Sequence, residues 1–128
     1  MLRTSKSRFK KYHILRRLIM ERIVVKELIK SDSATSPEKA KPLYDLIIKS
    51  INDRQLIIID FSNLTTITTA FFNSSIGNLY SAYPAKILNQ FVRIDPKTLT
   101  KLQYEKLKLV MHNAKSKLSE ADIREEID

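Results

Sequence analysis

Asp60 is the residue of this sequence that is best placed for chemistry. It follows the uninterrupted branched run 56–59, which predicts a strand buried on both faces. Functional groups of open α/β sheets gather at the carboxyl ends of such strands, and Asp60 is the only acid that we place at one. The same position suits a carboxylate that accepts backbone amides of the following turn. Asp60 is therefore a candidate strand-end acid with either role.

A threonine-rich turn after Asp60 is the more informative feature. It contains Thr65, Thr66, Thr68 and Thr69, and we expect Thr68 or Thr69 at the N-cap of a helix. A helix N-terminus presents free amides and the positive end of the helix dipole, which suit an anion or a phosphorylated side chain. The alternative is that the hydroxyls only cap the helix. Thr68 and Thr69 are thus candidates for a partner-binding or phospho-acceptor position.

Two polar residues extend this candidate surface along the helix. Asn73 and Ser74 fall on the side opposite the apolar Phe72 and Ile76, so we expect them to face solvent or a partner. Gly77 lies further along the same helix, where it costs about 1 kcal/mol relative to alanine. We expect this glycine to allow a close approach of the helix to the sheet.

The composition leaves little equipment for catalysis. No cysteine is present, which excludes disulfides, thiolate metal sites and cysteine nucleophiles. Gly77 is the only glycine, which excludes the glycine-rich loops that hold phosphates or dinucleotides. The two histidines, His13 and His112, have no local partner at metal-ligand spacing, and we expect His112 at the surface. We therefore predict a protein with no catalytic residue, no metal and no cofactor.

The net charge of +9 is concentrated in one segment. Residues 1–19 hold seven lysines and arginines and no acid, whereas the rest of the chain holds sixteen lysines and arginines and fourteen acids. Residues 1–19 are therefore a basic N-terminal arm, or an upstream extension with Met20 rather than Met1 as the start. Such an arm supports an alternative function, nucleic-acid binding through phosphate contacts and base stacking. Its candidate residues are Arg8, Lys10, Lys11, Arg16 and Arg17.

Hydrophobic periodicity predicts strands that alternate with helices. Ser36 before Pro37 is typical of a helix start, and Thr100 with Gln103 fits a capping box. The predicted order is strand 23–29, helix 37–51, strand 56–59, helix 70–83, strand 91–94 and helix 101–118. We expect a small α/β sandwich with a mostly parallel or mixed sheet and helices packed on it. Three strands are few, so an extra edge strand or a partner is expected to complete the sheet.

The motifs of this order resemble a known family. The segments 56–64, 67–73 and 76–80 combine a strand, an Asp-Phe pair, a Thr turn and Ile-Gly-Asn-Leu-Tyr. This combination is similar to the bacterial STAS-like domain family of unknown function, and the similarity extends over about 20–118. The resemblance implies a STAS-like domain at 20–118, with the acidic C-terminal tail 119–128 outside it.

The chain more distantly resembles the anti-sigma factor antagonist domains, which carry the true STAS fold. That resemblance implies a switch in which a GHKL-type ATPase or kinase phosphorylates a serine at a helix N-terminus. The phospho-acceptor position corresponds to Ala70, and the glycine that follows it in those domains is replaced by Phe71. Thr69, next to Ala70, is the residue here that offers a hydroxyl.

These observations together predict a non-catalytic, regulatory protein-binding module. Its expected partner is another protein, a GHKL-type ATPase or kinase by resemblance, and a second copy of the chain is an alternative partner. No apolar run approaches the roughly 18 residues of a membrane span, and the absence of cysteine suits a reducing compartment. We therefore expect a cytoplasmic protein.

Overall fold

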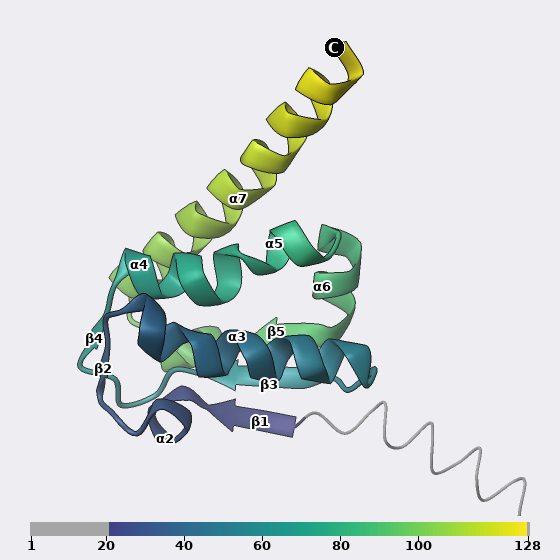
Figure 1. The fold of residues 1–128 in the computed structure, drawn as a ribbon. Helices are drawn as coiled ribbons and strands as arrows, with labels where there is room; N and C mark the ends of the chain where they lie inside the picture. The colour runs from purple at the N-terminus through teal and green to yellow at the C-terminus, as the bar shows by residue number, and fades with distance from the viewer. Residues whose placement is uncertain (1–20, 128) are drawn as a thin grey trace, which may run out of the picture.

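A parallel three-stranded sheet forms the base of the structure, a computed structural model that describes residues 21–127 and the side chains of 21–117. Its strands are β1 (Glu21–Val24), β3 (Ile57–Asp60) and β5 (Val92–Ile94), in the order β1-β3-β5 (Figure 1). β3, which carries the apolar run, is the central strand and is paired with β1 on one edge and β5 on the other. This arrangement confirms the α/β class.

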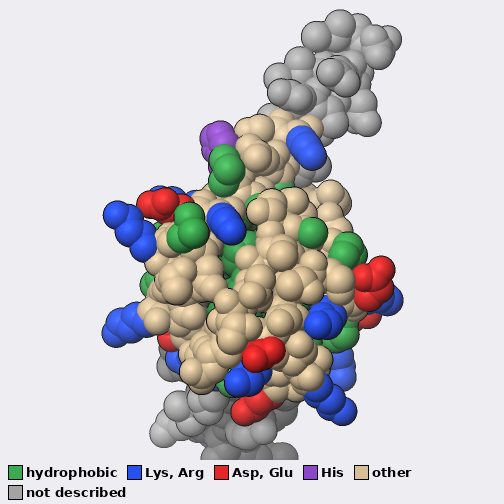
Figure 2. Space-filling view, turned by 90° about the vertical axis from the view of Figure 1, so that its left-hand side faces the viewer, with side chains coloured by type: hydrophobic (Ala, Val, Ile, Leu, Met, Phe, Trp, Pro, Cys, Tyr) green, Lys and Arg blue, Asp and Glu red, His purple; other side chains and the backbone are tan. Residues whose placement is uncertain are grey.

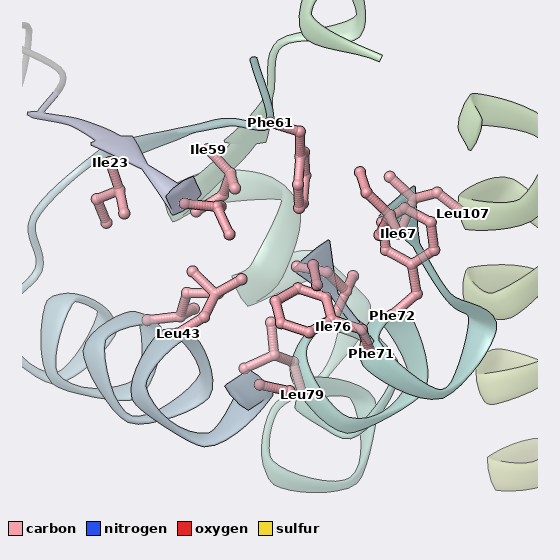
Figure 3. Packing of buried hydrophobic residues seen from close by; sticks show 14 of the residues in the cluster. Ile23, Leu43, Ile59, Phe61, Ile67, Phe71, Phe72, Ile76, Leu79 and Leu107 are labelled. Carbon is pink, nitrogen blue, oxygen red and sulfur yellow. The ribbon is translucent and has the colours of Figure 1, made fainter. Parts of the chain in front are cut away.

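Helices cover one face of this sheet. The first crossover carries α3 (Pro37–Asn52), and the second carries the helical residues 69–91. Both crossovers step across the sheet in the same direction, so right-handed connections place both on the same face. The buried side chains of Ile23 and Ile59 point toward these helices (Figure 3).

The opposite face of the sheet carries a row of side chains that includes two arginines. Arg22, Ile58 and Arg93 are paired in register across β1, β3 and β5. Both arginines are exposed and Ile58 is half-buried. Side chains of a strand alternate between the two faces, so this row points away from the covering helices.

Helix α3 forms as the sequence predicts. The Ser36 side chain accepts a hydrogen bond from the Lys39 amide at 3.2 Å, and Pro37 occupies the first turn, where no amide is needed. The apolar face predicted at helical spacing is the buried one, with Ala40, Leu43, Ile47 and Ile51 in the core.

The first predicted strand is too long. β1 ends at Val24, and residues Val25–Ile29 form the short helix α2. The apolar Val25, Leu28 and Ile29 follow helical spacing around exposed Lys26 and Glu27, and this periodicity outweighs the β-branched composition.

The helix predicted over 70–83 is interrupted. It consists of α4 (Thr69–Phe72), the π-helix η1 (Asn73–Gly77) and α5 (Leu79–Ala82), and α6 (Ala85–Phe91) follows Pro84. The Asn78 amide bonds to the Asn73 carbonyl at 2.9 Å, five residues back, as in a π-helix.

Gly77 allows a close approach, but not to the sheet as expected. A Cβ placed on Gly77 would lie 3.2 Å from Cγ1 of the buried Val110. Val110 belongs to α7 (Lys101–Ile127), so the glycine lets η1 approach α7.

Two further strands form a separate pair. β2 (Ser33–Ala34) and β4 (Thr66–Ile67) are parallel to each other, and no fourth strand joins the main sheet within residues 21–127. Each of the two leads directly into a helix, β2 into α3 and β4 into α4. The pair therefore places the N-terminal ends of α3 and α4 side by side (Figure 1).

α7 starts at the predicted capping box. Thr100 Oγ1 accepts from the Gln103 amide at 3.1 Å, and Gln103 Oε1 accepts from the Thr100 amide at 2.9 Å. Leu107 and Val110 are buried in the core, and His112 is exposed, as expected. The backbone of 119–127, the segment set apart as an acidic tail, continues this helix away from the sheet (Figure 1).

The core joins sheet, helices and α7. Phe61, just after β3, meets Phe72 of α4 edge to face, with ring centroids 5.6 Å apart. Phe71, Ile76 and Leu107 surround these rings (Figure 3). The strand end and the Thr turn are thus anchored on both sides by buried aromatic side chains.

Candidate functional site

The carboxyl ends of the three strands meet at one end of the molecule. The strands are parallel, so Val24, Asp60 and Ile94 all end at this edge, where α3 and α4 begin (Figure 1). The predicted strand-end acid and the Thr turn therefore lie at the same end of the fold, as expected for an open α/β sheet.

Asp60 forms an ionic bridge across this edge. Its Oδ2 accepts from Arg22 Nη1 at 2.8 Å, and Arg22 Nη2 donates to Asp95 Oδ2 at 3.2 Å. Asp60 Oδ1 accepts from the Ser62 amide at 2.8 Å. Arg22, Asp60 and Asp95 thus tie together β1, β3 and the end of β5.

The environment keeps Asp60 ionised. Burial raises the pKa of the Asp60 carboxyl, but hydrogen bonds from Ser62 and from Arg22, together with the Arg22 charge, lower it by more. The net pKa therefore lies below the ordinary value of an aspartate. Both carboxylate oxygens accept hydrogen bonds from protein groups, so Asp60 acts as a turn cap and a strand cross-link.

The expectation that Asp60 is the only acid at a strand end is wrong. Asp95 directly follows β5, and its amide bonds to the Ile59 carbonyl at 3.1 Å. The carboxyl-end rule that selected Asp60 also selects Asp95 once 91–94 is taken as a full strand of the sheet. Arg22 carried no comparable signal, because a single cation in an edge strand is common.

Thr68, not Thr69, is the N-cap of α4. Its Oγ1 accepts from the Phe71 amide at 3.2 Å and donates to the Thr35 carbonyl at 3.0 Å. The Thr68 hydroxyl is therefore fully engaged in linking α4 to the segment before α3. Thr69, the next residue, is exposed.

The other predicted residues of this surface differ in access. Asn73 is exposed one helical turn after Thr69, whereas Ser74 is half-buried. Thr35 and Thr66 are exposed on the two segments that pair beside the turn. We call these four exposed side chains, Thr35, Thr66, Thr69 and Asn73, the hydroxyl face.

The end of the molecule at which β2, β4 and the start of α4 lie carries few charges in its middle. Figure 2 views the molecule from the end at which the strands finish. A broad area of uncharged polar side chains and backbone crosses its middle, and Lys, Arg, Asp and Glu are spread around it. Charge is thus lower here than at the surrounding rim.

The candidate nucleic-acid residues Arg8, Lys10, Lys11, Arg16 and Arg17 lie outside the described residues, as do both candidate start methionines. Among the side chains of residues 21–117, no three His, Asp or Glu gather in a way that could hold a metal ion. None of the helices within residues 21–127 is both long enough and apolar enough to cross a membrane.

Comparison with known proteins finds a matching family model for the central part of the chain. No curated protein and no solved structure matches the chain significantly. Residues 39–99 match the model of a family described as STAS-like domain of unknown function (DUF4325). This segment contains most of α3, the strands β3 to β5 and the whole helical stretch between them. The STAS-like resemblance of the sequence is therefore confirmed over residues 39–99, in a small α/β fold consistent with that family.

Proposed function

We propose that this protein is a non-catalytic regulatory module that binds another protein through the hydroxyl face. The observation that carries the proposal is that Thr35, Thr66, Thr69 and Asn73 are exposed, at an end of the molecule whose middle carries few charges. Cores of protein interfaces are depleted of charged residues, whereas their rims are polar. A surface of this kind is suited to close contact with a partner.

The rigid support beneath the hydroxyl face favours the same function. The Thr68 hydroxyl joins the two helix starts, the β2–β4 pair holds them in register, and Phe71 and Phe72 are fully buried below them. A surface that is ordered before binding loses little conformational entropy when the partner arrives.

Thr69 is the residue through which binding would be regulated. A phosphate on Thr69 would add about two negative charges to a weakly charged contact. Binding a partner would remove water from these charges, and this cost would weaken the complex. The family resemblance suggests a GHKL-type ATPase or kinase as that partner, with the module cytoplasmic.

The test measures binding of a purified GHKL-type ATPase by the full-length chain and three variants. We expect wild type and Thr69→Ala to bind alike, since the alanine adds no charge, and Thr69→Glu to bind at least tenfold more weakly. The control is Ser81→Glu, which adds the same charge at an exposed position of α5.

Equal binding by all four proteins would contradict a switch at Thr69. The surface itself is tested by Asn73→Arg, which places a large cation on the hydroxyl face. Undiminished binding by Asn73→Arg would refute the hydroxyl face as the contact.

A further inference from the structure

A cavity lies at the opposite end of the molecule from the hydroxyl face. Its volume is about 790 Å³, and it is bounded by the end of α3, the turn before β3, the α5–α6 segment and β5. We call it the arginine pocket. Small-molecule sites occupy about 300–1,000 Å³, so the pocket has the size of a ligand site. Its lining residues are Ile51, Asn52, Arg54, Leu56, Tyr83, Ile87, Gln90, Phe91 and Arg93.

The charge of the pocket is one-sided. Among the residues that the structure describes, Arg54 and Arg93 are the only charged ones in its lining, and both are exposed. Neither forms an ion pair with an acid within residues 21–117. The Arg93 guanidinium makes only a long hydrogen bond, 3.4 Å, to the carbonyl of Val92. Neither guanidinium group thus has an acidic partner among the described residues, and the planar fork of an arginine matches phosphate and carboxylate oxygens.

Arg54 stands at a backbone position that usually carries glycine. Its φ is 55°, in the left-handed region. The Arg54 amide bonds to the Ile51 carbonyl at 3.0 Å and the Gln55 amide to the Ser50 carbonyl at 2.8 Å, which together form a Schellman motif at the end of α3. Glycine would adopt this conformation without the steric cost of a Cβ. An arginine here therefore does not follow from the demands of the turn.

The remaining lining residues supply apolar, aromatic and amide groups that could contact the uncharged part of a ligand. Ile51, Leu56, Ile87 and Phe91 give it apolar surface, and the ring of Tyr83 adds a second aromatic group. Asn52 of α3 and Gln90 of α6 add amide donors and acceptors to the lining. The Tyr83 hydroxyl donates to Asn52 Oδ1, which links the end of α3 to the end of α5.

We propose that the arginine pocket binds a small molecule in which a phosphate is attached to an aromatic body, of the size of a nucleoside monophosphate. Arg54 and Arg93 would hold the phosphate, the apolar and aromatic lining would cover the flat ring, and Asn52 and Gln90 would bond its edge. The basic segment 1–19 is a poor occupant, because its seven cations would meet two more.

The test titrates the full-length protein with AMP and GMP by isothermal calorimetry. Adenosine, guanosine and inorganic phosphate are titrated alongside, because each carries half of the proposed ligand. We expect saturable binding of at least one nucleotide, at least tenfold tighter than that of its nucleoside or of phosphate.

Three variants assign the binding to the pocket. Arg54→Gly removes one cation while suiting the left-handed turn, and Arg93→Gln removes the other without shortening the side chain much. Each of these two variants should weaken nucleotide binding at least tenfold. Arg54→Gly should not lower the unfolding temperature, because glycine suits the left-handed conformation at this position. The matched control is Lys30→Gly, which removes a cation at a second left-handed position, φ 55°, after α2 and outside the pocket lining. It should bind as wild type does.

Absence of saturable binding by both nucleotides would overturn the proposal, as would unchanged affinity in both arginine variants. Binding of inorganic phosphate as tight as that of the nucleotides would overturn the proposal that the pocket also binds an aromatic ring. The result is independent of the hydroxyl face, so Thr69→Glu should bind nucleotide normally whether or not it binds a protein partner.

Discussion

The strand-end carboxylate is the best-defined charged group of the structure. Asp60 is buried, with its side chain 11% exposed, and its oxygens accept from Arg22 and from the Ser62 amide. Such an arrangement stabilises the fold only while the carboxylate is ionised. A pH dependence of stability follows from it.

Asp60→Asn should therefore lower stability at neutral pH and matter less in acid. The folded-state pKa of Asp60 lies below that of the unfolded chain, about 3.9, so its contribution is complete above about pH 4 and is lost as the pH falls through the folded-state value. Losing charge-assisted hydrogen bonds should cost about 1–3 kcal/mol at pH 7. Urea unfolding of both proteins from pH 7 to pH 2 measures this difference.

The control for that series is Asp45→Asn. Asp45 pairs with Lys41 at 3.2 Å on the exposed side of α3, where such pairs contribute about 0.5 kcal/mol or less. A deficit of Asp60→Asn that stayed constant down to pH 2 would show that the ion bridge does not stabilise the fold.

The neighbouring threonines should separate by role. Thr68→Ala removes the N-cap of α4 and the link to the Thr35 carbonyl, and should lower the free energy of unfolding by about 1 kcal/mol. Thr69→Ala, at an exposed position, should change it by less than about 0.5 kcal/mol. The reverse order in chemical denaturation would mean that Thr69 caps the helix.

At the scale of the elements, η1 is shaped by its contact with α7. The fully buried Ser75 donates from its Oγ to the Phe71 carbonyl at 2.7 Å, and Gly77 leaves room for Val110 of α7. The π-helix and the glycine together fit this helical segment to its neighbour.

Gly77→Ala and Val110→Ala should therefore be energetically coupled. An alanine at 77 improves helix propensity by about 1 kcal/mol but places its Cβ 3.2 Å from Val110 Cγ1, and Val110→Ala removes that conflict. We expect Gly77→Ala to be more favourable in the Val110→Ala background by at least about 0.5 kcal/mol in a double-mutant cycle. Leu102, 63% exposed on the same helix, is the control, because its replacement by alanine should be additive with Gly77→Ala.

Sequence reasoning predicted those elements whose signals are local. The Ser36 and Thr100 caps, the apolar face of α3 and the central run of β3 each depend on residues within a few positions, and all are present in the structure. The start of α2 was missed because branched residues suited a strand equally well.

Long-range features could not be predicted in this way. The Arg22–Asp60–Asp95 bridge joins residues up to 73 positions apart, and no local pattern pairs them. The arginine pocket has the same origin, since Arg54 and Arg93 come together only when α3 and β5 are placed. In the candidate site, the sequence indicated the Thr turn but not which threonine is accessible, because that depends on the Thr35 carbonyl.

At the scale of the whole molecule, charge is segregated along the chain. Residues 1–19 carry seven cations and no acid, whereas the rest is close to balance. The proposed protein binding through the hydroxyl face and the alternative, nucleic-acid binding through the arm, would therefore depend on different parts of the chain.

Replacing the arm cations by glutamine should distinguish the proposed function from its alternative. In the full-length chain, glutamine at 8, 10, 11, 16 and 17 should leave capture of a protein partner unchanged and abolish any salt-dependent affinity for DNA or RNA. Fluorescence anisotropy with a labelled oligonucleotide at two salt concentrations measures the second effect. Nucleic-acid affinity that persists in this variant would exclude the arm as its source.

The two crossover helices have a mechanical consequence. α3 begins beside the hydroxyl face and ends at the arginine pocket, about 24 Å away for its 16 residues, and the segment 69–83 runs between the same two ends. A sliding or rotation of either rod would alter both surfaces at once. The length of α3 thus fixes how far apart the two surfaces lie, so an insertion or deletion within this helix would displace one surface relative to the other.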